Sequence, residues 1–98
     1  MSQSIMRFCE QLVDRVNEHG CRVVIPYGEP SPLAVMFDGN FDGAEFIPSY
    51  PATLHIYGLP GHVSVSCINT IRQIRPNKYV VNFGDDSQQM DLMVKILE

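Results

Sequence analysis

The first periodic pattern along the chain predicts an amphipathic helix over residues 4–19. Its apolar side chains recur at intervals of three and four, which places them on one side of a helix. They are Ile5, Phe8, Cys9, Leu12, Val13 and Val16. Charged and polar residues take the opposite side. Gly20 is suited to end the helix, because glycine adopts the left-handed conformation of a helix C-terminus at little cost.

Short runs of apolar and β-branched residues predict strands after this helix. Residues 21–25 form the first predicted strand, residues 33–37 the second and residues 44–47 a brief third. The prolines within residues 26–32 exclude regular structure there. Residues 38–43 have the composition of a turn, so we expect them to connect two strands.

The strongest sheet signal surrounds the compact turn Gly58-Leu59-Pro60-Gly61. A hairpin closed by this turn has Tyr57 opposite His62, and His55 opposite Ser64. Because side chains alternate along a strand, the hairpin acquires one apolar and one polar face. The apolar face holds Leu54, Ile56, Val63, Val65 and Cys67, and the polar face holds Thr53, His55, Tyr57, His62, Ser64 and Ser66.

Two more strands are predicted on either side of the turn Pro76-Asn77, at residues 71–75 and 78–83. The alternation slips before them, so we expect a bulge or bend near residues 68–70. In the simplest register, one face holds Ile74, Tyr79, Val81 and Phe83, and the other holds Ile71, Arg75, Lys78, Val80 and Asn82.

The last segment, residues 86–97, predicts a second helix. Asp86 followed by Gln89 resembles a helix capping box. A stripe at helical spacing is formed by Met90, Met93, Val94 and Leu97. Leu92 lies off this stripe, so we expect it to be exposed.

Together these elements predict a single α+β domain over residues 1–98. We expect a curved antiparallel sheet of roughly four to six strands, with an N-terminal and a C-terminal helix packed on one face. A strongly bent, half-barrel sheet is the competing interpretation. The expected buried layer is Phe8, Leu12, Val16, Val23, Leu54, Ile56, Val63, Val65, Val81, Phe83, Met93 and Leu97.

Composition narrows the function classes. The 98 residues include seven Lys+Arg and eleven Asp+Glu, a formal net charge of −4. An acidic chain is a poor general partner for phosphate backbones or anionic lipid, which disfavours nucleic acid and membranes as partners. No apolar run approaches the roughly 20 residues that span a bilayer. Three cysteines without a C-x-x-C motif fit reduced thiols in a cytoplasmic protein better than a disulfide framework.

The segment Asp38–Gly43 also resembles the first half of an EF-hand calcium loop. Asp38, Asn40 and Asp42 would supply oxygens at alternate positions. The residue at the place of the bidentate glutamate is Ser49, however, and prolines follow. We therefore interpret the segment as turns, keep weak calcium binding as the alternative, and predict no cofactor.

The polar face of the first hairpin is the most suggestive candidate site. His55, Tyr57, His62 and Ser64 are expected to lie together there. Two imidazoles are a start for a metal site, although local spacing reveals no third ligand. With an orienting carboxylate they could also act as acid and base beside a Ser64 nucleophile. The simpler interpretation is a solvated face or a surface that binds a partner.

Arg72, Arg75 and Lys78 cluster at the second hairpin. Such a cluster could hold a carboxylate or a phosphate. The simpler interpretation is charge that keeps a sheet edge from aggregating.

These observations favour a small non-catalytic binding or assembly module that acts through protein–protein contact as a homodimer. The alternative is a protein that binds a small ligand or metal ion at the His55/His62 face or at residues 38–43. A small hydrolase or isomerase built on His55, His62 and Ser64 is the least favoured hypothesis, because no catalytic motif surrounds these residues and a concave site would be needed.

Overall fold

The computed structural model describes residues 3–26, 35–49 and 51–98. Within this part of the chain one helix, α1 (Gln3–His19), precedes eight strands. The strands are β1 (Cys21–Pro26), β2 (Val35–Phe41), β3 (Gly43–Ile47), β4 (Thr53–Gly58), β5 (Gly61–Ser66), β6 (Ile68–Arg75), β7 (Lys78–Asp85) and β8 (Gln88–Ile96). Residues 27–34, where the second predicted strand would begin, lie outside the described residues.

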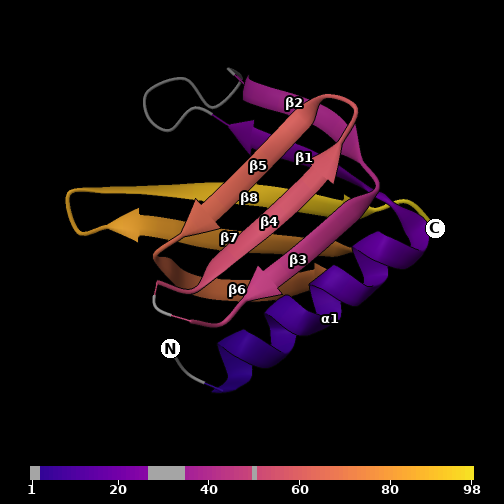
Figure 1. Ribbon diagram of the computed structural model, residues 1–98. Helices are drawn as coiled ribbons and strands as arrows, with labels where there is room; N and C mark the ends of the chain where they lie inside the picture. Colours follow the sequence, from indigo (N-terminus) through magenta and orange to yellow (C-terminus); the bar gives the residue numbers. More distant parts are fainter. Residues whose placement is uncertain (1–2, 27–34, 50) are drawn as a thin grey trace.

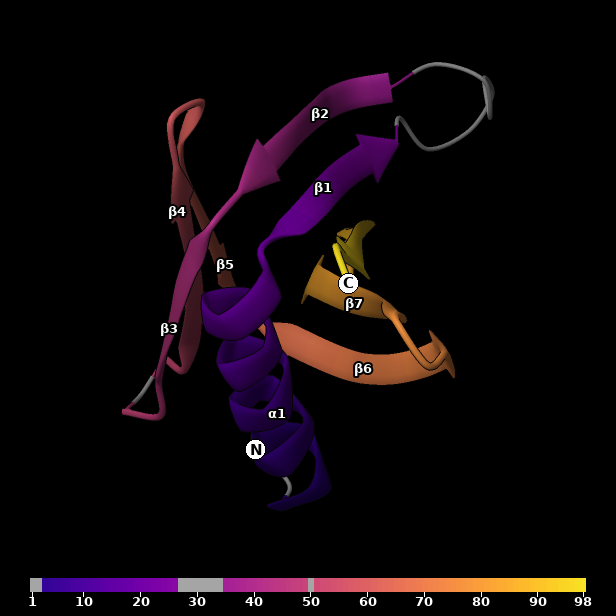
Figure 2. The same ribbon diagram turned by 90° about the vertical axis from the view of Figure 1, so that its right-hand side faces the viewer.

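The strands form two antiparallel sheets (Figure 1). The larger has the order β2-β1-β8-β7-β6, and the smaller has the order β3-β4-β5. The chain passes between the sheets twice through a single residue, at Asp42 between β2 and β3 and at Cys67 between β5 and β6. The two sheets therefore face each other across a shared core, with α1 between them at one end (Figure 2).

The backbone of β4 passes close to the chain at the corner between β2 and β3, which explains the glycine at position 58. A Cβ atom on Gly58, at the end of β4, would lie 2.9 Å from the Cα of Phe41. Nearby, the Asp42 N–H donates a hydrogen bond to the Tyr57 carbonyl oxygen at 3.1 Å. Glycine at position 58 thus allows β4 to pass against the corner where the chain changes sheets.

Helix α1 forms as the apolar periodicity predicts, and it closes the core. Cys9, Leu12 and Val16 on its apolar side are fully buried. Gly20 has a φ of 79° and ends the helix, with its N–H bonded to the Val16 carbonyl oxygen at 2.7 Å. The side chain of Asn17 also binds the backbone of Ala44 through both its oxygen and its nitrogen, which covers the outer edge of β3.

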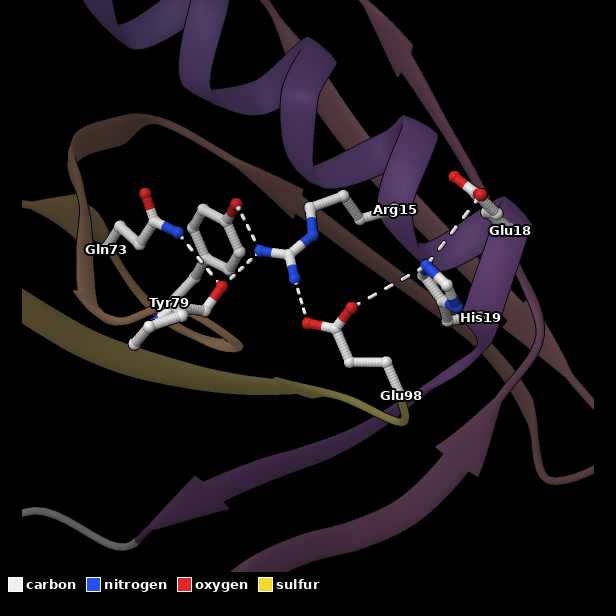
Figure 3. Close-up of polar contacts among 7 residues, drawn as sticks. Arg15, Glu18, His19, Gln73, Tyr79 and Glu98 are labelled. Atoms are coloured by element: carbon white, nitrogen blue, oxygen red, sulfur yellow. Dashed lines mark hydrogen bonds and ion pairs between the residues drawn. The ribbon is translucent and has the colours of Figure 1, made fainter.

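Arg15 fastens the helix to the larger sheet (Figure 3). Its guanidinium donates hydrogen bonds to the Tyr79 hydroxyl at 3.2 Å, to the Pro76 carbonyl oxygen and to the Glu98 carboxylate. The same guanidinium lies 5.8 Å from the centre of the Tyr79 ring. Tyr79 is fully buried, so Arg15 supplies the hydrogen bond that its hydroxyl needs in the core.

The predicted C-terminal helix is wrong, and with it the α+β fold class of two helices packed on one curved sheet of four to six strands. The described part of the chain is mostly β, with one helix and two antiparallel sheets. Residues 88–96 form β8, which pairs with β1 on one side and with β7 on the other. The segment carries a second pattern of period two, Met90, Leu92, Val94 and Ile96, in which Met90 is half-buried and the other three are buried in the core. Leu92 is therefore fully buried, whereas Leu97 is 44% exposed. Pairing with two neighbours has selected the strand pattern over the helical one.

The turn before β8 is also a hairpin turn and not a helix N-terminus. Asp85, and not Asp86, provides the local hydrogen bonds, accepting from the Ser87 N–H and the Gln88 N–H at 3.0 Å each. Gly84 has a φ of 115°, and a Cβ there would lie 2.2 Å from the Gln88 carbonyl oxygen. Only glycine fits this conformation without moving the backbone.

Two register details differ from the sequence-based expectation. The bulge near residues 68–70 is confirmed, but Cys67 before it has a φ of 55° and is exposed instead of joining the core. A second irregularity, between Gln73 and Arg75, brings Ile71 opposite Val81 and leaves Ile74 47% exposed. The register expected from the sequence had instead placed Ile74 on the same face as Tyr79 and Val81, and Ile71 on the other face.

Candidate functional site

The hairpin of β4 and β5 forms in the register that the sequence predicts. Tyr57 pairs with His62, and His55 pairs with Ser64. Leu54, Ile56 and Val65 are buried, and Val63 packs against them. The polar residues therefore lie on the outer face of the three-stranded sheet, with a fixed apolar layer beneath them.

Two imidazoles and a hydroxyl converge on this face. The Nδ1 atom of His55 lies 2.8 Å from Nε2 of His62 and 3.0 Å from Oγ of Ser64. The Ser64 Oγ lies 3.0 Å from Nε2 of His62. These three atoms form a nearly equilateral triangle, which we call the imidazole cluster.

Tyr57 and Glu45 flank the imidazole cluster. The Tyr57 ring stacks on the His62 ring with centroids 4.6 Å apart and an interplanar angle of 22°. Glu45 on β3 lies opposite His55. Desolvation raises the pKa of Tyr57, and the charge and hydrogen bond of Glu45 raise it further. The tyrosine thus remains a neutral, stacked neighbour that restricts how the imidazoles turn.

The imidazole cluster is open to solvent. His62 and Ser64 are exposed, and Tyr57 is 38% exposed. Among the described residues, no group of three or more His, Cys, Asp or Glu side chains is placed to hold a metal ion. Chemically, the cluster offers two nitrogen donors and one hydroxyl oxygen on an open sheet surface.

Residues 38–43 form neither the turns that the sequence favours nor an EF-hand loop, the basis of the calcium alternative. Residues 38–41 belong to β2, where Asp38 lies opposite Val24 and Asn40 lies opposite Arg22. The Arg22 guanidinium donates to both carboxylate oxygens of Asp38, with the Nε–Oδ1 distance 2.8 Å. Hydrogen bonding from Arg22 lowers the pKa of Asp38. An extended strand cannot wrap its oxygens around one ion as an EF-hand loop does.

A row of basic residues crosses the outer face of the five-stranded sheet. Arg22 on β1 pairs with Lys95 on β8, which pairs with Lys78 on β7, which pairs with Arg75 on β6. Four adjacent strands therefore carry a cation at the same level, and we call these residues the basic row. Strands lie about 4.8 Å apart, so the row spans roughly 14 Å.

An apolar floor lies beside the basic row. Val24, Met93 and Val80 follow one another across β1, β8 and β7, and Arg72 lies at the end of this second line. Val80 is only 7% exposed although it is not part of the core cluster, so the neighbouring side chains of this face cover it. A hollow of ≈ 120 Å³ is lined by Arg22, Val24, Lys78, Met93 and Lys95.

The structure thus places Arg72, Arg75 and Lys78 in a larger basic surface than the sequence predicted. Arg22 and Lys95 were missed, because no local spacing relates them to the second hairpin. Lys95 was also assigned to a helix. The alternation of Met93 and Lys95 with Leu92, Val94 and Ile96 was the signal that could have revealed it.

The thiols do not add a reactive site in the core. Cys9 and Cys21 are fully buried, and Cys67 is exposed. Burial raises the pKa of Cys9 to about 11, helped by the charge of Glu10, and burial raises the pKa of Cys21 to about 12. All three cysteines are free, as predicted.

Comparison with known proteins does not assign the chain. It matches no family model, no curated protein and no solved structure. None of the helical residues that the structure describes belongs to a helix long and apolar enough to cross a membrane.

Proposed function

We propose that this chain is a non-catalytic protein-binding module that docks an acidic segment of a partner protein on the outer face of its five-stranded sheet. The observation that carries the proposal is the basic row, Arg22, Lys95, Lys78 and Arg75. Like charges directly opposite one another destabilise a sheet. Four in succession therefore impose a cost on folding that binding an anionic partner would offset.

The charges of the basic row are mostly uncompensated within the chain. Arg22 is paired with Asp38 at one end of the row. Lys78, Lys95 and Arg75 make no ion pair with any of the residues that the structure describes. Five of the seven Lys+Arg of an otherwise acidic chain, Arg72 included, gather around this face. Such a local field attracts an anionic partner and orients it on approach.

The apolar residues beside the basic row, and the hollow that they help to line, indicate what kind of anionic partner can bind this face. Val24 and Met93 line the hollow together with three cations, so an apolar side chain can insert while neighbouring carboxylates meet the basic row. Its volume of ≈ 120 Å³ lies below the roughly 300–1,000 Å³ of sites that enclose drug-sized ligands. These features favour a peptide segment that alternates acidic and apolar residues, because such a strand presents both along its length.

Single-stranded nucleic acid suits this face less well. Binding of single strands usually combines cations with aromatic side chains on which the bases stack. The residues that line the hollow include no aromatic side chain. The net charge of −4 also repels a long phosphate backbone beyond the basic row.

Fluorescence anisotropy with a labelled synthetic peptide of alternating Glu and Leu tests the proposal. We expect saturable binding that weakens with salt and weakens roughly tenfold or more in Lys78→Glu or Lys95→Glu. Arg7→Glu is the matched control, because it makes the same charge change on an exposed position of α1 and should leave binding intact.

Three outcomes would contradict the proposal. They are no saturable binding of the peptide, equal loss of binding in the Arg7→Glu control, or tighter binding of a labelled single-stranded oligonucleotide than of the peptide. A version of the peptide with Gln in place of Glu should bind weakly, since it lacks the carboxylates that the basic row attracts.

The expectation of a homodimer stays a prediction. A two-fold dimer through the outer face of the five-stranded sheet would bring two basic rows together, which disfavours that face as the contact. Light scattering at high micromolar concentration measures the oligomeric state directly, and a monomer there would remove the homodimer hypothesis.

A further inference from the structure

The imidazole cluster lies on the opposite sheet from the basic row and carries an independent inference. Its three donor atoms, His55 Nδ1, His62 Nε2 and Ser64 Oγ, are separated by 2.8, 3.0 and 3.0 Å. Neutral imidazole nitrogens are the ligands that first-row transition metals prefer among uncharged side chains. In the absence of an ion the three groups hydrogen-bond to one another. Tautomers with the ring protons on Nε2 of His55 and Nδ1 of His62 leave both nitrogen lone pairs and the hydroxyl oxygen available to one ion.

The spacing of the donors matches neighbouring corners of a square-planar or octahedral site. Two nitrogens that each bind one ion at about 2.0 Å lie roughly 2.8–2.9 Å apart when the angle between the bonds is near 90°. At the tetrahedral angle of Zn²⁺ they would lie roughly 3.3 Å apart. The two imidazole nitrogens lie 2.8 Å apart, a hydrogen-bond distance in the absence of an ion, and binding an ion at the smaller angle would leave this separation nearly unchanged.

The surroundings hold this arrangement in place. His55 and His62 come from paired neighbouring strands whose inner side chains, Leu54 and Ile56 among them, are fully buried. Tyr57 stacks on His62 and lies parallel to His55, with an interplanar angle of 14° to the latter. Little side-chain freedom is therefore left to lose when an ion binds.

The charge on this face also favours a cation. Its described residues, read from the pairing of β3, β4 and β5, are Gly43, Glu45, Ile47, Thr53, His55, Tyr57, His62, Ser64 and Ser66. Glu45, opposite His55, is the carboxylate in this set, and the set contains no Lys or Arg. A divalent cation at the cluster thus meets a negative neighbour and no formal positive charge.

We propose that His55, His62 and Ser64 form a binding site for a divalent transition-metal ion of the Cu²⁺ or Ni²⁺ type, with water completing the coordination on the open side. Hard cations such as Ca²⁺ and Mg²⁺ are not expected to bind, because they require oxygen ligands. Zn²⁺ should bind more weakly than Cu²⁺ and Ni²⁺, both because of the angle and because of its lower place in the affinity series relative to Cu²⁺.

Isothermal titration calorimetry with Ni²⁺ in a non-chelating buffer tests the site on the whole chain. We expect one saturable site per chain and at least a tenfold weaker affinity in His55→Ala or in His62→Ala. His19→Ala is the matched control, since His19 lies on α1, where its imidazole faces Glu18 and Glu98 (Figure 3). Cys67→Ser should also bind normally, which excludes the exposed thiol as the ligand.

Spectroscopy on the Cu²⁺ complex provides a second readout that does not depend on affinity. Electron paramagnetic resonance should show coupling to two nitrogens in the wild type and to fewer in either histidine variant. Circular dichroism should show unchanged folding, because His62 is exposed and His55, although half-buried, lies on the outer face of the sheet and not in the core cluster.

The proposal is overturned if the wild type binds neither Ni²⁺ nor Cu²⁺ saturably, if the double variant His55→Ala/His62→Ala binds as tightly as the wild type, or if Zn²⁺ binds more tightly than Ni²⁺.

Discussion

Lys78 and Lys95 lie directly opposite each other on β7 and β8, in the interior of the five-stranded sheet. Cross-strand partners are the nearest side-chain neighbours that a sheet provides, and a pair of like charges there is unfavourable. Arg22 and Arg75 extend the same repulsion to both sides. This relationship links the stability of the sheet to the charge that we propose it uses for binding.

Removing one of these charges should therefore stabilise the fold while it weakens binding of the acidic peptide. We expect Lys95→Thr to raise the free energy of unfolding by about 0.2–1 kcal/mol, since threonine also favours strands. Urea denaturation at low salt measures the change. The gain should shrink as salt is added, because salt screens the repulsion in the wild type. A loss of stability in Lys95→Thr would contradict this account of the basic row.

Arg15 is expected to be the polar side chain whose loss costs the most stability. Arg15→Ala leaves the buried Tyr79 hydroxyl without its partner and removes the contacts to Pro76 and Glu98. We expect a loss of about 1–3 kcal/mol in the free energy of unfolding, measured by chemical denaturation. Tyr79→Phe should cost less, because it removes the hydroxyl together with its need for a partner. Arg7→Ala, at an exposed position of the same helix, should have little effect.

The hairpin of β4 and β5 was predictable because all of its determinants are local. Alternation defines its faces, and the turn at Leu59-Pro60 sets the register in which His55 meets Ser64. The imidazole cluster was therefore within reach of the sequence, apart from the distances between its donors.

The segment 88–96 shows where local pattern fails. It carries a helical stripe and a strand alternation at once, and its choice depends on β1, more than sixty residues earlier in the chain. The basic row could not be predicted for the same reason, because Arg22 and Lys95 become neighbours only through the pairing of β1 with β8. Residues Asp38 to Phe41 show the converse. Their composition is that of a turn, yet they form part of an edge strand, where such residues are tolerated.

The three thiols should differ sharply in reactivity. At about pH 8 we expect one thiol per folded chain, Cys67, to react rapidly with a disulfide reagent, because Cys9 and Cys21 are buried and their raised pKa keeps them protonated. All three should react in denaturant. The folded Cys67→Ser variant should show no rapid phase, and rapid reaction of two or more thiols in the folded wild type would show that the core is less protected than the structure indicates.

The carboxylate of Asp85 should stabilise the β7–β8 hairpin in a pH-dependent way. Hydrogen bonds from Ser87 and Gln88 lower its pKa below the usual 3.8. A carboxyl whose pKa is lower in the folded than in the unfolded state contributes stability above the unfolded value, and this contribution is lost as the pH falls through the folded value. We therefore expect Asp85→Asn to lower the Tm by a few degrees near neutral pH, with the difference closing at strongly acidic pH. Asp86→Asn, one residue along the same turn, is the control and should follow the wild type, because Asp86 accepts none of these bonds. A Tm difference that stays constant across the acid range would show that the charge of Asp85 does not stabilise the turn.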